Sequence, residues 1–167
     1  MNQARLRDTG RFQNLSSRNA STIEPDTSDE LLEILNPENR YAKPLRPAGR
    51  RSSATDCYTS SKGTSIGTGG LTRILDIDRT AMTVTAQAGV PLDALNRALA
   101  KEGLELYGSF ELTGRTLGGA IASPCFGPNI GRKAAYLSSS VKHLKLALAN
   151  GRLLLSLIHI SEPTRPF

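Results

Sequence analysis

Residues 73–103 constrain the fold most, because they hold two short strand patterns followed by a strong helix pattern. RILDID is apolar and ends on an acidic residue. In MTVTAQAG, apolar side chains alternate with polar ones. The apolar positions of the second stretch are Met82, Val84, Ala86 and Ala88. Strict alternation is typical of a strand with one buried face. We therefore predict a pair of strands here.

The helix pattern is PLDALNRALAKEG. Leu92, Leu95 and Leu99 have helical spacing and fall on one face. Pro91 is suited to the first helical turn, and Gly103 to the position just past the end. The fold must bury this leucine face, and the two preceding strands are its natural partner.

The remaining elements are shorter. Thr27 and Glu30 have the spacing of a capping box before an apolar run that Pro37 ends. GTSIGT reads as a short strand, and VKHLKLALANGRLL as a hairpin with Leu144, Leu146 and Leu148 on one face. Its Asn150-Gly151 pair is a strong turn signal. The order of helix, loop, strands, helix, glycine-rich loop (residues 107–131) and strand predicts an α+β or mixed α/β fold.

Two common nucleotide-binding motifs are absent from the sequence. GTGG at residues 67–70 precedes no convincing helix, and no G-x-G-x-x-G occurs. No G-x-x-x-x-G-K-[ST] loop occurs either. An ordinary Rossmann domain and a P-loop domain are therefore excluded as interpretations.

The charge leaves a second class of function open. The chain has 167 residues, enough for one domain with a real core, and a net charge of +6. Residues 1–20 contain four arginines and one aspartate, which indicates a flexible basic arm. Such an arm, with Arg50 and Arg51, is compatible with a non-catalytic interaction or nucleic-acid-binding protein. Aromatic residues make up only 5%, so few platforms exist for stacking bases.

The expected location is the cytoplasm. The N-terminus lacks the apolar stretch of a secretory signal, and no apolar run is long enough to span a bilayer. Cys57 and Cys125 do not have a metal-binding spacing and are expected to be free thiols. No metal is expected.

Two segments join small residues to hydroxyls. They are RPAGRRSSAT at residues 46–55 and GRTLGGAIAS at residues 114–123. Small side chains let backbone N–H groups approach a phosphate closely, and hydroxyls add further donors. Together the two loops could hold a diphosphate, although each glycine alone is also explained by ordinary turn chemistry.

With these loops in place, residues 23–154 resemble the FAD-binding domain of the p-cresol methylhydroxylase and vanillyl-alcohol oxidase (PCMH) family. IEPDTSDELLEIL is similar to the entry strand and helix, LRPAGRRSS to the first pyrophosphate loop, and TLGGAIASPCFG to the second. The stretch from LTRILDID to GLEL and the hairpin VKHLKLALANGRLL follow the family order. The branch of sugar-lactone and polyol oxidases is the most similar.

The resemblance implies a truncated FAD-binding domain over residues 21–154. In the family, this domain consists of two α+β subdomains. Family members oxidise a carbon that bears a hydroxyl, amine or phenol by hydride transfer to FAD. An alcohol, sugar or aldonolactone is the implied substrate of the full-length protein. No catalytic residue can be assigned within this chain. The implied cofactor-binding residues are Ala48, Gly49, Arg50, Arg51, Ser52, Ser53, Gly114, Thr116, Leu117, Gly118, Gly119, Ala122 and Ser123.

Departures from the family pattern imply that FAD is not covalently bound. The first-loop position of the flavin-linked histidine is Ser52, and the second-loop position of the flavin-linked cysteine is Gly114. Cys125 lies beyond that position and is expected to be a small loop or core residue. His143, among leucines, is expected to be a surface or structural histidine.

The last segment, LSLIHISEPTRPF at residues 155–167, departs from the family. Its sequence resembles a translated sequencing adapter, and we expect it to be non-native and to pack poorly on residues 21–154. The alternative is that LLLSLIHI extends the preceding strand.

Overall fold

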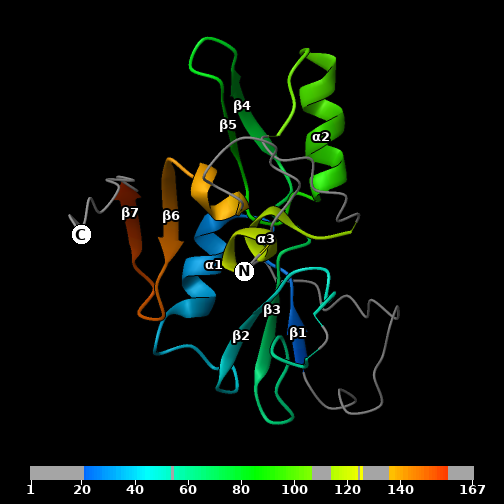
Figure 1. The fold of residues 1–167 in the computed structure, drawn as a ribbon. Helices are drawn as coiled ribbons and strands as arrows, with labels where there is room; N and C mark the ends of the chain where they lie inside the picture. Colours follow the sequence, from blue (N-terminus) through cyan, green and yellow to red (C-terminus); the bar gives the residue numbers. More distant parts are fainter. Residues whose placement is uncertain (1–20, 54, 107–113, 124, 126–135, 158–167) are drawn as a thin grey trace, which may run out of the picture.

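A computed structural model describes residues 21–53, 55–106, 114–123, 125 and 136–157. The predicted basic arm (residues 1–20) and much of the predicted glycine-rich loop lie outside this part. The described chain mixes helices and strands, as predicted. Figure 1 shows β1–β3 at one end and β4, β5 and α2 at the other, with α3 between them.

A three-stranded parallel sheet forms the first end of the molecule. Its strands are β1 (Ser21–Ile23), β3 (Thr64–Gly67) and β2 (Leu45–Ala48), in the spatial order β1-β3-β2. All four residues of β3 are buried, as expected of a central parallel strand. Helix α1 (Ser28–Leu35) covers one face, where Ile34 packs with Ile23 and Ile66.

The predicted capping box starts α1. The backbone N–H of Glu30 donates to Oγ1 of Thr27 at 3.1 Å. The Glu30 carboxylate accepts from the N–H of Asp26 at 2.8 Å, one residue before the usual partner. The helix ends at Leu35, and its C-cap, Asn36, immediately precedes Pro37. The helix boundaries were therefore readable from local sequence.

The second end contains the predicted strand pair and helix. Strands β4 (Ile74–Asp78) and β5 (Thr83–Ala86) pair antiparallel, and α2 spans Leu92–Lys101. Leu95 and Leu99 are buried in one cluster with Val90, against partly buried side chains of both strands. Pro91 is the N-cap of α2, one position earlier than predicted.

The prediction for Met82 is wrong. Met82 is 70% exposed and has φ of 53°, so it lies in the turn between β4 and β5 and not on the buried face. The alternation that included it begins only at Val84, which is partly buried against α2. A left-handed residue ends strand geometry, because it turns the chain away from the extended direction.

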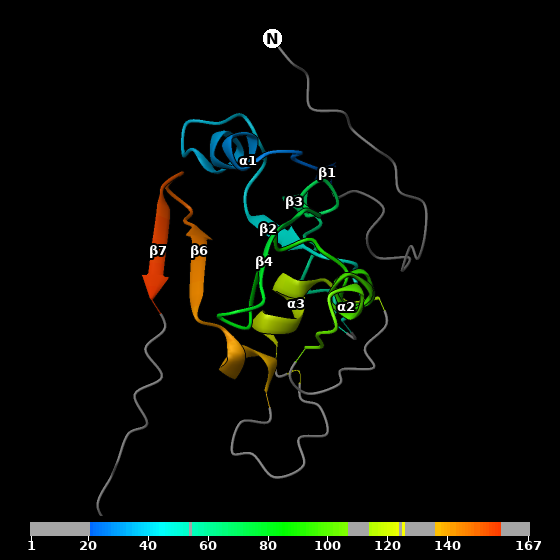
Figure 2. The same ribbon diagram turned by 90° about the horizontal axis from the view of Figure 1, so that it is seen from above.

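The expectation of one continuous loop over residues 107–131 is also wrong. Residues Leu117–Ala122 form a short helix, α3, and a 3₁₀ turn follows at Leu137–Ser140. Two glycines make this segment a poor helix by intrinsic propensity. It is helical because Thr116 caps it and because Ala120 is buried in a cluster with Leu92. Figure 2 shows α3 beside α2.

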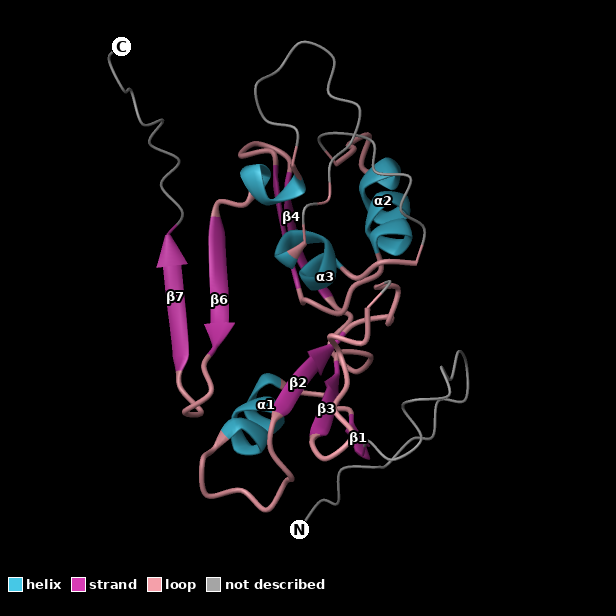
Figure 3. Cartoon of the chain, turned by 60° about the horizontal axis from the view of Figure 1, so that its bottom comes forward, coloured by secondary structure: helices cyan, strands magenta, loops and turns pink. Residues whose placement is uncertain are grey.

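The predicted hairpin consists of β6 (His143–Ala147) and β7 (Leu153–Leu157), which pair antiparallel. Gly151 in its turn has φ of +74°, a conformation that favours glycine. His143 is exposed on β6, in agreement with the surface interpretation. Figure 3 shows the hairpin as a separate two-stranded layer beside α1.

Strand β7 corrects part of the expectation for the tail. Residues 155–157 pair with residues 143–145 of β6, so their backbone is not poorly packed, although Leu155 is 61% exposed. Residues 158–167 lie outside the described chain. The interpretation of residues 155–167 as foreign sequence stays a prediction, and a genomic read past codon 154 tests it.

No helix in the described ranges combines the length and the apolar character that crossing a bilayer requires.

Candidate functional site

The carboxyl ends of the parallel strands meet at one edge of the sheet, which faces α3 (Figure 3). Ile23 pairs with Ile66 there, and Ala48 pairs with Gly67. The N–H of Thr68 donates to the carbonyl of Ala48 at 3.0 Å, which fixes the point where the first loop leaves β2. In open α/β sheets, ligands bind at this carboxyl edge. The first predicted loop therefore begins at a favourable place for a ligand.

The structure brings the two predicted loops into contact. A Cβ atom added to Gly49 would lie only 2.6 Å from Oγ1 of Thr116. Thr116 is 5% exposed, and its Oγ1 accepts a hydrogen bond from the N–H of Gly119 at 3.2 Å. Gly49 and Thr116 are far apart in sequence, so this contact joins two segments that sequence analysis could only propose to be neighbours.

The first loop has unused hydrogen-bond donors. Within the described part of the chain, the backbone N–H groups of residues 49–53 donate no hydrogen bond. A row of successive free N–H groups favours an anion, since each carries a partial positive charge. The loop next to Gly49 can therefore accept a phosphate without breaking a hydrogen bond to any described residue.

The second loop differs, because the N–H groups of residues 117–120 are already used. Leu117 donates to the carbonyl of Val90 and Gly118 to that of Ala88, each at 2.8 Å. Gly119 donates to Thr116. The second loop therefore supplies a close, fixed wall and not a second row of free donors. The reason is that the first turn of α3 packs on the segment between β5 and α2, whose carbonyls at Ala88 and Val90 accept from it.

The two arginines of the first loop have different environments. The Arg51 guanidinium donates to Oγ1 of Thr22 on β1 at 2.9 Å, so this side chain lies back across the sheet. Arg51 has φ of 54°. Arg50 is exposed and has no hydrogen bond or ion pair within the described residues. Arg50 is thus the cation of this loop that can reach a ligand.

The segment after the loop covers the second face of the parallel sheet. Thr22, Ser65 and Arg46 are in register and share this face, opposite α1. Ser65 is 1% exposed and donates to the carbonyl of Tyr58 at 2.9 Å. Arg46 donates to the carbonyl of Cys57 at 3.2 Å. These bonds tie the segment that follows the first loop to β2 and β3.

The other predicted site residues lie on or beside these two loops. Ala48 is buried at the end of β2, whereas Ser52 and Ser53 are exposed in the first loop. Gly114 has φ of +92°, which favours glycine. Ser123 donates to the carbonyl of Gly119 at 2.8 Å. Arg115 was not among the predicted site residues, and its guanidinium lies 3.5 Å from Oγ of Ser123.

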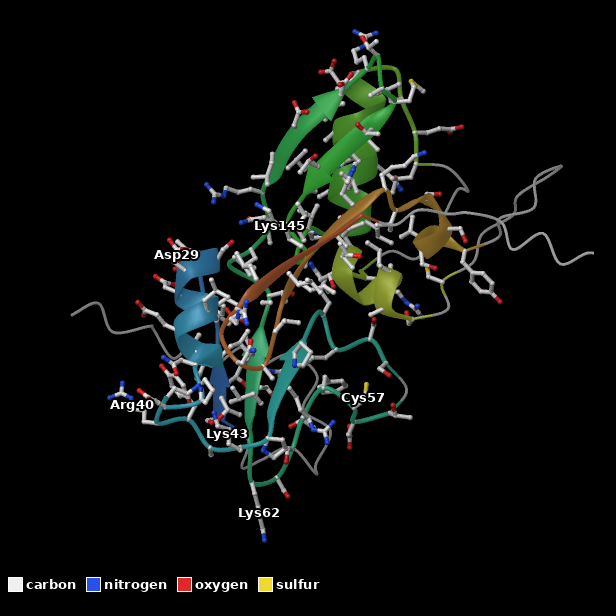
Figure 4. The ribbon with its side chains drawn as sticks, turned by 90° about the vertical axis from the view of Figure 1, so that its left-hand side faces the viewer. Asp29, Arg40, Lys43, Cys57, Lys62 and Lys145 are labelled. Carbon is white, nitrogen blue, oxygen red and sulfur yellow. The ribbon has the colours of Figure 1, made fainter. Side chains whose placement is uncertain are left out.

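Both cysteines are free thiols, and their environments are opposite. Cys125 is 2% exposed in the cluster with Leu92 and Ala120, which confirms its prediction as a core residue. Cys57 is exposed (Figure 4), and its Sγ lies 3.6 Å from Oγ of Ser53. Hydrogen bonds from the side chains of Ser53 and then Thr55 lower the pKa of the Cys57 thiol, because they favour the thiolate.

We expect Cys57 to react with iodoacetamide much faster than Cys125 in the folded chain. A lowered pKa increases the thiolate fraction at neutral pH, and the thiolate is the nucleophile. The pH at which the alkylation rate is half-maximal should lie below that of the same thiol in denaturant. Mass spectrometry of the peptides measures both rates. Cys57→Ser is the control, and equal rates for the two cysteines would contradict the structure.

These features suit a large anionic cofactor. The row of free N–H groups and the exposed Arg50 provide donors, and the absence of a Cβ at Gly49 lets the two loops close on each other. The fold and this loop pair define a nucleotide-cofactor domain of the flavoprotein class.

Comparison with known proteins supports this class. Residues 20–155 match the family described as FAD binding domain, and the chain belongs to that family. The resemblance to a PCMH-type flavoprotein is therefore confirmed, and FAD is the cofactor.

The similar proteins are oxidoreductases by name. The chain is 27% identical over 135 residues to L-gulono-1,4-lactone dehydrogenase of Mycobacterium tuberculosis, which covers 81% of this chain and 31% of that protein. It is 31% identical over 132 residues to L-gulonolactone oxidase of Bos taurus, covering 79% and 29%. The chain thus spans about a third of the length of these proteins.

Two solved structures have the same fold. A variant of berberine bridge enzyme in complex with (S)-reticuline has a TM-score of 0.73 and 26% identity, over 86% of this chain and 29% of that one. The 6-hydroxy-D-nicotine oxidase of Arthrobacter nicotinovorans has a TM-score of 0.71 and 15% identity, over 92% and 32%.

Proposed function

We propose that the first loop binds the diphosphate of FAD and that α3 with its preceding residues forms the opposite wall. The observation that carries this proposal is the contact of Gly49 with Thr116, which sets free N–H groups beside a fixed second loop. Charge-assisted hydrogen bonds to phosphate are roughly twice as strong as neutral ones.

The roles of the predicted residues divide accordingly. Gly49, Arg50, Ser52 and Ser53 donate to the phosphates through backbone, guanidinium or hydroxyl groups, whereas Arg51 positions the loop through Thr22. The wall consists of Gly114, Thr116, Leu117, Gly118, Gly119, Ala122 and Ser123. Ala48 ends β2 and fixes where the loop starts.

For the whole protein, the proposed activity is oxidation of a hydroxyl-bearing carbon of an alcohol, sugar or aldonolactone. Bound FAD supplies the hydride acceptor, and the protein supplies orientation. The names of the similar proteins, L-gulono-1,4-lactone dehydrogenase and L-gulonolactone oxidase, support this substrate class. The residues that act on the substrate are unassigned.

The test of cofactor binding is a titration of the chain with FAD at several salt concentrations. Arg50→Gln should weaken FAD binding by about tenfold and reduce its salt dependence, because one charge-assisted contact is lost. Arg97→Gln is the matched control, since Arg97 is exposed on α2 and pairs with Asp93. FAD affinity that Arg50→Gln leaves unchanged would contradict the role of Arg50.

We expect the 167-residue chain alone to bind FAD weakly and to oxidise no alcohol or lactone. It spans only 31% and 29% of the dehydrogenase and oxidase to which it is similar, so most of their length is not represented. Anaerobic mixing of the FAD-loaded chain with L-gulono-1,4-lactone tests this at the flavin absorbance band. Substrate-dependent bleaching of that band would show the expectation to be wrong.

A further inference from the structure

Arg115 is a half-buried cation without a counter-charge in the described chain. Its guanidinium has one hydrogen bond, to Oγ of Ser123 at 3.5 Å, and it takes part in no ion pair among the described residues. A guanidinium has five N–H donors, and partial burial is unfavourable unless an anion or several acceptors compensate. Among the described residues, Arg115 therefore has one weak neutral acceptor and no anion.

The backbone of Arg115 is held firmly. Its carbonyl accepts from the N–H of Leu92 at 2.9 Å, and the next residue, Thr116, forms a bridge with Pro91. The side chain thus starts from a fixed point on the second loop, directly before the residue that contacts Gly49. A side chain that starts from a fixed backbone position loses less conformational freedom when it binds an anion.

A role as a helix cap explains Arg115 less well. Cations often bond to the last carbonyls of a helix. Here the carbonyl of Gly119 already accepts from Oγ of Ser123 at 2.8 Å, and the Arg115 guanidinium bonds to that hydroxyl and not to a carbonyl. The long 3.5 Å contact leaves most of its donors available.

The three arginines next to the loop contact are therefore not equivalent. Arg50 follows Gly49 and is exposed, Arg51 is committed to Thr22, and Arg115 precedes Thr116. Arg50 and Arg115 are thus the chain neighbours of Gly49 and Thr116, one in each of the two loops that touch. Two cations from two loops match a doubly charged ligand better than a neutral one.

We propose that Arg115 is a second cation for the diphosphate, acting from the second loop opposite Arg50. This inference rests on the proposed FAD site and extends it, because it gives the second loop a charged role in addition to that of a wall. The chemistry that Arg115 recognises is an organic diphosphate, which FAD and ADP share and riboflavin lacks.

The experiment titrates the 167-residue chain and its variants with FAD, ADP and riboflavin. Arg115→Gln should weaken binding of FAD and ADP by about tenfold or more, reduce the salt dependence of both, and leave riboflavin affinity unchanged. Arg115→Lys keeps the charge and should recover part of the affinity. Arg97→Gln should behave like the unmodified chain.

The possible results separate the two proposals. Unchanged FAD affinity in Arg115→Gln, together with weakened binding in Arg50→Gln, would overturn the role of Arg115 and leave the FAD site intact. An equal loss for riboflavin and ADP would show that Arg115 acts only through the fold. An unmodified chain that binds neither FAD nor ADP would overturn both.

Discussion

Gly49→Ala is expected to weaken FAD binding by at least tenfold and to lower the midpoint of thermal unfolding by several degrees. The added Cβ would lie 2.6 Å from Oγ1 of Thr116. Thr116 cannot rotate away at low cost, because it is buried and its hydroxyl caps α3 through the N–H of Gly119. The two loops must then separate, and overpacking of this kind costs about 1–3 kcal/mol.

Two further variants make this prediction specific. Gly69→Ala is the matched control, because its Cβ would meet only the end of the flexible Glu24 side chain at 3.3 Å. In a Thr116→Ala background, the added methyl group at position 49 should cost much less, since the clashing hydroxyl is absent. Isothermal calorimetry and thermal melts measure both effects. If Gly49→Ala binds FAD as tightly as Gly69→Ala does, the loop contact is not part of the binding site.

Local sequence was sufficient for most elements of the fold. Thr27 with Glu30 marked the start of α1, and the spacing of Leu92, Leu95 and Leu99 marked the buried face of α2. These signals depend on neighbouring residues only, so no tertiary information was needed.

Elements that depend on distant contacts could not be predicted. The segment with Gly118 and Gly119 has low helix propensity, and it is helical because Thr116 caps it and Ala120 packs with Leu92. Met82 continues the alternating pattern of the strand, so the pattern alone does not show that it lies in the turn. Its backbone φ angle does. Tertiary contacts override local preference in α3, whereas the turn before Met82 is stabilised locally, by hydrogen bonds from the N–H groups of Thr80 and Ala81 to the Asp78 carboxylate.

The two loops of the candidate site could be predicted from the sequence, but the separate roles of their arginines could not. Small residues and hydroxyls identified both loops, yet nothing in the sequence told Arg50 from Arg51, one exposed and the other bonded to Thr22 of β1. Arg115 lies within the predicted second loop, but no role was predicted for its side chain. A lone arginine within a glycine-rich loop is the signal that could have identified it.

Acid precipitation of the FAD-loaded protein is expected to leave all of its flavin in the supernatant. A covalent link in the first loop requires an imidazole, and Ser52 has only a weakly nucleophilic hydroxyl. A link in the second loop requires a thiolate, and Gly114 has no side chain. Cys125 is 2% exposed among apolar side chains, so its sulfur is unavailable. Affinity must then come from hydrogen bonds to the diphosphate and from burial of the ring.

Cys57 makes this test more demanding, because its exposed thiol has a lowered pKa and lies beside Ser53 of the first loop. Precipitation should therefore be repeated with Cys57→Ser, and flavin fluorescence read in the washed pellet and in the supernatant. Both proteins should release their flavin completely. A fluorescent pellet from the unmodified protein would contradict the non-covalent prediction. Loss of that fluorescence in Cys57→Ser would assign the covalent bond to Cys57. If the fluorescence persists in Cys57→Ser, another residue carries the bond.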